Sequence, residues 1–198
     1  MLADLTGFTR LRASGPDLLG LLHRLSTQDL KDLAIGTGAP TVVTSAKGRI
    51  IERLFVHRAA EQDVWLCGGP GAGERVLAHL KKYTFAERTG LSDATASTAQ
   101  LAMLGGAIPG LPDPGPWGVV EGTLAGVKVV VLGQDGFTSQ GRSIVCAAAD
   151  RPALDALGPT IDAEELEAWR VRLGYPAPGR ELTEDWNPLE AGLRDHVS

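Results

Sequence analysis

The stretch TVVTSAKGRIIERLFVHR, residues 41–58, determines the expected fold more directly than any other part of the chain. Two runs rich in β-branched and aliphatic residues, 41–45 and 49–58, flank the dipeptide Lys47-Gly48. Short apolar runs on either side of a glycine-containing turn are typical of a β-hairpin. The stretch therefore predicts two antiparallel strands, and with them a sheet.

Helices are expected on both sides of this hairpin. Upstream, leucines recur with the i, i+3, i+4, i+7 spacing of one helix face, at Leu18, Leu21, Leu22 and Leu25. Downstream, residues 63–67 read as a third strand, and a second apolar face follows at Val76, Leu77, Leu80 and Tyr83. This half of the chain thus predicts a sheet with packed helices.

The second half adds more strands and one well-bounded helix. Apolar runs predict strands at residues 99–104, 127–132 and 143–148, while four prolines make residues 108–117 an extended loop. Asp162 is placed to cap a helix, with Glu165 at the capping-box position and Gly174 as the stop. Strands and helices do not alternate strictly, so we expect an α+β fold with antiparallel sheets.

Charge, hydropathy and cysteine usage exclude several classes of function. The 198 residues carry a net charge of −5 with no block of like charge, which argues against nucleic-acid binding. The apolar runs are shorter than the roughly 20 residues that a membrane-spanning helix needs. The two cysteines, Cys67 and Cys146, lie far apart in the sequence, and the histidines lack the spacing typical of metal ligands. The sequence therefore predicts neither a disulfide nor a metal site. Residues 1–15 lack a secretory signal, so a cytoplasmic location is expected.

A glycine cluster at residues 68–73 follows a predicted strand and precedes a helix, as a phosphate-binding loop does. Its spacing fails, however, because Glu74 stands where the dinucleotide-binding pattern needs glycine. We therefore expect a tight strand-to-helix turn.

Glu52 is the first candidate site residue. Side chains alternate along a strand, so Glu52 shares the face of Ile50, Leu54 and Val56, while Arg53 points to the other face. A carboxylate on an apolar face costs several kcal/mol unless it is paired with another group or has a function. Two alternatives follow: an edge-strand carboxylate that reaches solvent, or a functional group.

Arg170 is the second candidate. It stands at i+4 from Leu166 and three residues before Leu173, on or beside the apolar stripe of the last predicted helix. A guanidinium in such a place pairs with a carboxylate or a phosphate, because it has five donors to satisfy. A structural salt bridge and an anionic ligand are the two alternatives.

Several segments together resemble the YgfZ/GcvT folate-binding family. This family includes the glycine-cleavage T-protein, an aminomethyltransferase, and YgfZ-type proteins linked to iron–sulfur cluster assembly or repair. The most specific match is the stretch Asn-Pro-Leu-Glu-Ala-Gly-Leu, residues 187–193. Weaker matches in the same order cover residues 15–17, 25–29, 44–50, 133–137, 170–176 and 179–182.

The resemblance implies that Glu52, Gln134 and Arg170 contact tetrahydrofolate or a one-carbon derivative. Gln134 stands where the family has a folate-contacting glutamate, and Arg170 matches the family's arginine. Glu52 and Arg53 stand where the T-protein has two aspartates, so Glu52 is a weak catalytic candidate. These departures favour the YgfZ-like branch over the aminomethyltransferases.

The resemblance also predicts the organisation of the chain. Residues 1–198 are expected to form the N-terminal folate-binding fold as two interleaved subdomains, roughly 1–40 with 105–160 and 41–104 with 161–198. The family's C-terminal barrel is missing, and its Lys-Gly-Cys-Tyr motif is expected just after Ser198, so we expect a fragment of a longer protein.

The resulting hypothesis is a cytoplasmic, folate-binding YgfZ-like protein that supports iron–sulfur enzymes, which would be its client partners. An aminomethyltransferase that passes a one-carbon unit to tetrahydrofolate is the alternative, and whether the chain is an enzyme stays open. A shortened, non-catalytic scaffold is the third possibility.

Overall fold

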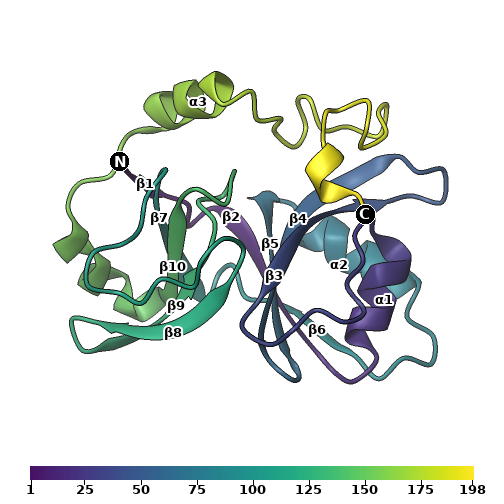
Figure 1. Ribbon diagram of the computed structural model, residues 1–198, viewed down its shortest axis with the longest axis horizontal. Helices are drawn as coiled ribbons and strands as arrows, with labels where there is room; N and C mark the ends of the chain where they lie inside the picture. Colours follow the sequence, from purple (N-terminus) through teal and green to yellow (C-terminus); the bar gives the residue numbers. More distant parts are fainter. The chain divides into compact units, whose positions relative to one another are not determined.

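The computed structural model describes all 198 residues and divides them into two units, each built from two separate stretches of chain. Unit 1 holds residues 1–7 and 95–175, and unit 2 holds residues 8–94 and 176–198. The first two strands, purple in Figure 1, therefore belong to different sheets. Each unit contains one five-stranded antiparallel sheet.

Unit 2 contains the predicted hairpin at one end of its sheet. The strand order is β3-β4-β5-β2-β6, and the bounds are β2 Phe8–Ser14, β3 Gly38–Thr44, β4 Ile50–Ala60, β5 Asp63–Pro70 and β6 Gly90–Asp93. The strand β4 pairs with β3 on one side and β5 on the other, so it is an interior strand. This position buries both faces of β4 along most of its length.

Helices α1 (Leu18–Leu25) and α2 (Gly73–Lys82) pack on one face of this sheet. Their apolar faces contribute Leu22 and Val76 to a core that includes Leu54 and Leu66 of the strands. Burial of such side chains stabilises the fold by roughly 1.5–3 kcal/mol each. The leucine spacing in the sequence thus identified the face that α1 buries.

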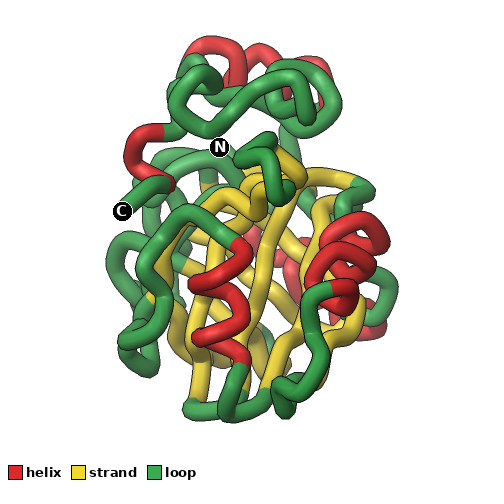
Figure 2. Tube along the Cα trace, turned by 90° about the vertical axis from the view of Figure 1, so that its right-hand side faces the viewer, coloured by secondary structure: helices red, strands yellow, loops and turns green.

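The C-terminal segment 176–198 returns to the hairpin of unit 2 after the chain has formed most of unit 1. Leu182 and Leu193 pack with Val42 and Ile50, and the backbone N–H of Ile50 donates to the carbonyl of Trp186 over 3.0 Å. The segment ends after the short 3-10 helix η2 (Arg194–His196), the red turn before the C-terminus in Figure 2.

Unit 1 has the strand order β1-β7-β10-β9-β8, with β1 Leu2–Asp4, β7 Thr98–Met103, β8 Val119–Leu124, β9 Val127–Leu132 and β10 Arg142–Ala147. The 3-10 helix η1 (Ala148–Leu157) and helix α3 (Ala163–Arg172) follow the last strand. Leu101, Val131 and Ile144 come from three neighbouring strands and share one core with Leu154 of η1. Asp162 caps α3 as predicted, because its carboxylate accepts from the N–H of Glu165 over 2.8 Å.

The predicted α+β class with antiparallel sheets and packed helices is confirmed. Three edge strands were not predicted: β1 with three residues, β6 with four and β8 with six. None of the helices is long and apolar enough to cross a bilayer.

The observed division of the chain differs from the expected one in three places. Residues 95–104 lie in unit 1 instead of with 41–94, because β7 pairs with β1 and β10. Residues 8–40 lie in the unit that also holds the hairpin, because β2 pairs with β5 and α1 packs on the same sheet. Residues 161–175 lie in unit 1 instead of with 41–104, and Ile161 bridges Ala3 there.

Candidate functional site

Glu52 lies on the core face of β4, as its alternation with Leu54 predicted. Its side chain is fully buried, with Oε2 2.8 Å from Nη2 of Arg75 on α2 and Oε1 3.3 Å from the N–H of Gly69. Burial raises the pKa of Glu52, while the hydrogen bond from Gly69 and the charge of Arg75 oppose that rise. The solvent-reaching alternative was wrong, because β4 is an interior strand and Glu52 is paired inside unit 2.

Gly69 lies near the end of β5, within the glycine cluster at residues 68–73. Residues 71 and 72 of this cluster form the expected tight connection from strand to helix α2. A Cβ at Gly69 would lie 2.3 Å from Cγ of Pro178, so only glycine fits beneath the C-terminal segment. The N–H group of Gly69 donates to a carboxylate of the protein's own core. The cluster therefore binds Glu52 and holds the C-terminal segment.

Gln134 lies in the loop between β9 and β10 and is completely buried. Its side-chain oxygen accepts from the N–H of Gly136, and its backbone carbonyl accepts from Oγ of Ser143 over 2.7 Å. The side-chain nitrogen Nε2 has no hydrogen-bond partner. A buried amide nitrogen without an acceptor is unusual, since such groups are nearly always satisfied.

Asp135 holds this loop in place. Its carboxylate accepts from the N–H groups of Phe137, Thr138 and Gly105 over 3.1, 2.8 and 3.2 Å. Burial raises the pKa of Asp135, and these hydrogen bonds oppose that rise. The loop is thus fixed by side chains that all belong to unit 1.

Arg170 is 5% exposed near the end of α3. Its Nε and Nη2 donate to the two carboxylate oxygens of Glu167 over 2.9 and 2.6 Å, and Nη1 donates to the carbonyl of Tyr175. A bidentate pair of this kind is strong and directional. The structural salt bridge, one of the two predicted alternatives, is therefore present.

An aromatic cluster connects the Gln134 loop with the end of α3. The ring of Phe137 lies 5.6 Å from that of Trp169 and 6.3 Å from that of Tyr175, between centroids. In the chain, Gln134 is three residues from Phe137, and Arg170 directly follows Trp169. Glu52 belongs to unit 2. Sequence reasoning missed the cluster because its contacts join residues more than thirty positions apart.

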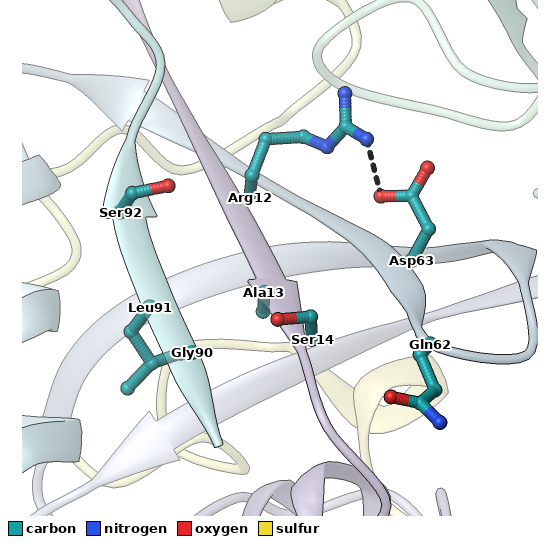
Figure 3. Close-up of a pocket in the computed structure, with 8 residues that line it drawn as sticks. All are labelled: Arg12, Ala13, Ser14, Gln62, Asp63, Gly90, Leu91 and Ser92. Atoms are coloured by element: carbon teal, nitrogen blue, oxygen red, sulfur yellow. Dashed lines mark ion pairs between the residues drawn. The ribbon is translucent and has the colours of Figure 1, made fainter.

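Unit 2 also contains an open pocket of about 580 Å³ at the β2–β6 side of its sheet, shown in Figure 3. Arg12 and Asp63 form an ion pair across it with an N···O distance of 2.6 Å, and the Arg12 guanidinium lies 4.4 Å from the centroid of the Trp65 ring. The remaining lining residues are small, polar or aliphatic: Ala13, Ser14, Gln62, Gly90, Leu91 and Ser92. Its charges cancel, so the pocket offers hydrogen bonds to a small polar molecule without favouring an anion.

The structure contains no group of three or more His, Cys, Asp or Glu side chains placed to hold a metal ion.

Comparison with known proteins identifies the relationship of the chain. The family model of the GCVT N-terminal domain matches residues 1–107, more than half of the length. The chain belongs to this family. The predicted resemblance to the GcvT family is thereby confirmed.

Similar curated proteins extend the match beyond residue 107. The aminomethyltransferase of Symbiobacterium thermophilum is 28% identical over an alignment of 218 residues. The alignment covers 97% of this chain and 58% of that protein. A putative chloroplastic transferase of Arabidopsis thaliana is 27% identical and covers all of this chain and 49% of that protein. The chain thus spans about half to three-fifths of the length of these relatives.

Solved structures show the same fold. The glycine cleavage system aminomethyltransferase T of Bartonella henselae matches with a TM-score of 0.81 at 20% identity, over 100% of this chain and 57% of that one. A chain of heterotetrameric sarcosine oxidase from Corynebacterium matches with a TM-score of 0.51 at 14% identity, over 82% of this chain and 87% of that one. The expected GcvT N-terminal fold is confirmed.

Proposed function

We propose that this chain binds tetrahydrofolate or a one-carbon derivative and takes part in one-carbon transfer of the aminomethyltransferase kind. The observation that carries the proposal is the match to proteins named aminomethyltransferase along 96–99% of the chain. This proposal reverses the preference drawn from the sequence, where the YgfZ-like branch came first.

The three predicted site residues differ in whether their polar atoms are free to contact a folate. Gln134 has a buried amide nitrogen with no partner, which suits the polar edge of a pterin ring. The carboxylate oxygens of Glu52 are taken by Arg75 and Gly69, and Arg170 holds Glu167 and the Tyr175 carbonyl. We therefore assign ligand contact to Gln134 and a positioning role to Arg170, both of which belong to unit 1.

Arg170 positions the ligand site through unit 1. Its bonds to Glu167 and Tyr175 fix the end of α3, and Trp169 and Tyr175 of the same segment contact Phe137 of the Gln134 loop. Loss of the guanidinium would loosen the packing of Trp169 and Tyr175 on Phe137 of the Gln134 loop. Tetrahydrofolate supplies the nitrogen that accepts the one-carbon unit, while these residues bind and orient it.

The test is calorimetric titration of the chain with tetrahydrofolate under reducing conditions. We expect measurable affinity that Gln134→Leu weakens by about tenfold, as for loss of one buried hydrogen bond, and that Arg170→Ala also weakens. Gln140→Leu is the matched control, because Gln140 is an exposed glutamine of the same loop. Absence of folate binding would support the scaffold alternative and contradict the proposal.

A specific observation favours a YgfZ-like, non-transferase function as the second candidate. In the family resemblance the T-protein has two aspartates where this chain has Glu52 and Arg53, and the Glu52 carboxylate is engaged inside unit 2. Such a protein would bind folate and support iron–sulfur enzymes, but it would not transfer a one-carbon unit. The test is an assay for ammonia release from an aminomethylated lipoyl carrier in the presence of tetrahydrofolate. A chain that binds folate but releases no ammonia in this assay would support this second candidate.

A further inference from the structure

The open pocket around Arg12 is built from two rows of residues on one face of the unit 2 sheet. In the first row, Arg12 of β2 lies opposite Trp65 of β5 and Ser92 of β6. In the second row, two residues further along β2, Ser14 lies opposite Gly90. Residues two positions apart on a strand share a face, so both rows belong to the same side of the sheet. Helices α1 and α2 cover the opposite side, and the pocket is therefore separate from that core.

The hollow beside Ser14 exists because residue 90 is glycine. A Cβ at Gly90 would lie 2.7 Å from Oγ of Ser14, closer than a Cβ normally approaches another atom. Without this methyl group, Ser14 stays exposed in the pocket, and Ser92 of the neighbouring strand is exposed as well. Two hydroxyl groups, each able to donate and to accept, are therefore open to a ligand.

Arg12 is held in one orientation before any ligand arrives. Its Nη2 lies 2.6 Å from Oδ1 of Asp63, toward which Figure 3 shows the side chain extending, and its Cζ lies 4.4 Å from the centroid of the Trp65 ring. Trp65 is only 3% exposed, so it gives the guanidinium a firm support. The side chains of Arg12 and Asp63 nevertheless remain 44% and 32% exposed. Further N–H donors and a second carboxylate oxygen are thus available side by side.

The pair of charges disfavours ions as ligands. An anion that approaches Arg12 also meets the negative charge of Asp63, and a cation that approaches Asp63 meets the guanidinium. The other polar side chains of the pocket, Ser14, Gln62 and Ser92, are neutral, and each can both donate and accept. A matching ligand is therefore neutral and carries several groups that donate and accept. Hydroxyl groups on adjacent carbon atoms have this property.

We infer that this pocket binds a neutral sugar ring through its vicinal hydroxyl groups. One hydroxyl accepts from the guanidinium of Arg12, its neighbour donates to the carboxylate of Asp63, and the serine hydroxyls pair with the others. The volume of about 580 Å³ lies within the roughly 300–1,000 Å³ that is usual for small-molecule sites. The pocket belongs to unit 2 and the Gln134 loop to unit 1, so this inference goes beyond the proposed function.

The experiment titrates the chain with the methyl α-glycosides of glucose, mannose and galactose and follows the backbone N–H signals of Gly90 and Ser92 by NMR. The mannoside and the galactoside each differ from the glucoside in the orientation of one hydroxyl group, so a site that pairs with vicinal hydroxyls distinguishes them. Gly90→Ala fills the hollow, and Arg12→Ala removes the charged donor. Arg49→Ala is the matched control, because Arg49 is a 42% exposed arginine of unit 2 whose ion pair with Glu190 lies outside the pocket.

We expect at least one glycoside to bind and to shift the Gly90 and Ser92 signals. Arg12→Ala and Gly90→Ala should each weaken binding by about tenfold or more, as for the loss of a hydrogen bond to a charged group or of access to the site, while Arg49→Ala should leave it unchanged. Asp63→Ala leaves the Arg12 charge unbalanced, so the preference should turn from the neutral glycoside to the anion glucuronate.

Absence of shifts with all three glycosides overturns the inference. Equal binding by the unmodified chain and by the Arg12→Ala and Gly90→Ala variants overturns it as well, because the sugar then binds elsewhere. An unchanged preference in Asp63→Ala contradicts the role of the charge pair. Tetrahydrofolate binding is measured separately on the same chain, so each of these results leaves the proposed function intact.

Discussion

Removal of the Arg75 guanidinium tests how the buried carboxylate of Glu52 is held. Arg75→Ala leaves Glu52 with the Gly69 N–H as its remaining hydrogen-bond donor. Breaking a fully buried ion pair costs about 3–5 kcal/mol, whereas an exposed pair is worth about 0.2–1 kcal/mol. The Glu52 side chain is 0% exposed and that of Arg75 48%, so we expect an intermediate loss of about 1–3 kcal/mol at pH 8.

The loss should depend on pH, with a sign that follows from the pKa of Glu52. Burial raises this pKa above its ordinary value of 4.5, so the folded state holds the proton more tightly than the unfolded state. The contribution of Glu52 to stability is thus fully present below pH 4.5 and is lost as the pH rises through the folded pKa. Arg75→Ala raises that pKa further, so its cost should be larger at pH 8 than at pH 4.5.

Urea unfolding followed by tryptophan fluorescence at the two pH values measures these differences. Lys81→Ala is the control, because Lys81 is exposed on the same helix and should change stability by less than about 0.5 kcal/mol. Glu52→Gln should be within about 1 kcal/mol of the unmodified protein at pH 8, since it keeps an acceptor for Gly69 and removes the buried charge. An Arg75→Ala cost that is equal at both pH values would refute this account of Glu52.

Two further predictions concern unit 2. Burial, together with the charge of Arg53, lowers the pKa of His196 from 6.5 to about 4. The contribution of His196 to stability is therefore present above pH 6.5 and is lost as the pH falls toward 4. In the variant His196→Gln, thermal unfolding across this pH range should show a flatter dependence of stability on pH, by at most about 3 kcal/mol. Gly69→Ala places a methyl group 2.3 Å from Pro178 Cγ and should destabilise the protein by about 1–3 kcal/mol; limited proteolysis should then cleave the C-terminal segment sooner, and an unchanged cleavage rate would contradict the contact.

Features that depend on neighbours in sequence were predictable. The cap of Asp162 on α3 needs only three residues. The alternation along residues 52–56 correctly placed Glu52 on the face of Leu54 and Val56, whereas Ile50 was wrongly placed there, because a register shift puts it in the cluster with Val42. The strands predicted at residues 127–132 and 143–148 are present as β9 and β10. In each case the controlling geometry lies within one element or one turn.

Features that depend on strand order or on distant partners were not predictable. The sequence left open whether Glu52 reaches solvent at an edge strand, because a single strand does not reveal its neighbours. Its partner Arg75 comes from a helix 23 positions later. The Phe137–Trp169 contact joins a loop to a helix, and no periodicity signals such a pair. Short edge strands such as β6, with four residues, carry too few alternations to be recognised.

The return of the C-terminal segment to the hairpin has a consequence for the order in which the protein matures on the ribosome. Unit 2 begins at Phe8, yet its cluster around Ile50 lacks Leu182 and Leu193 until almost all 198 residues have been made. Unit 1 needs residues 1–7 but cannot complete its sheet before β10 is synthesised. Unit 2 therefore cannot finish folding as a simple N-terminal piece and stays partly open until residues 176–193 have emerged, by which time all of unit 1 has been synthesised.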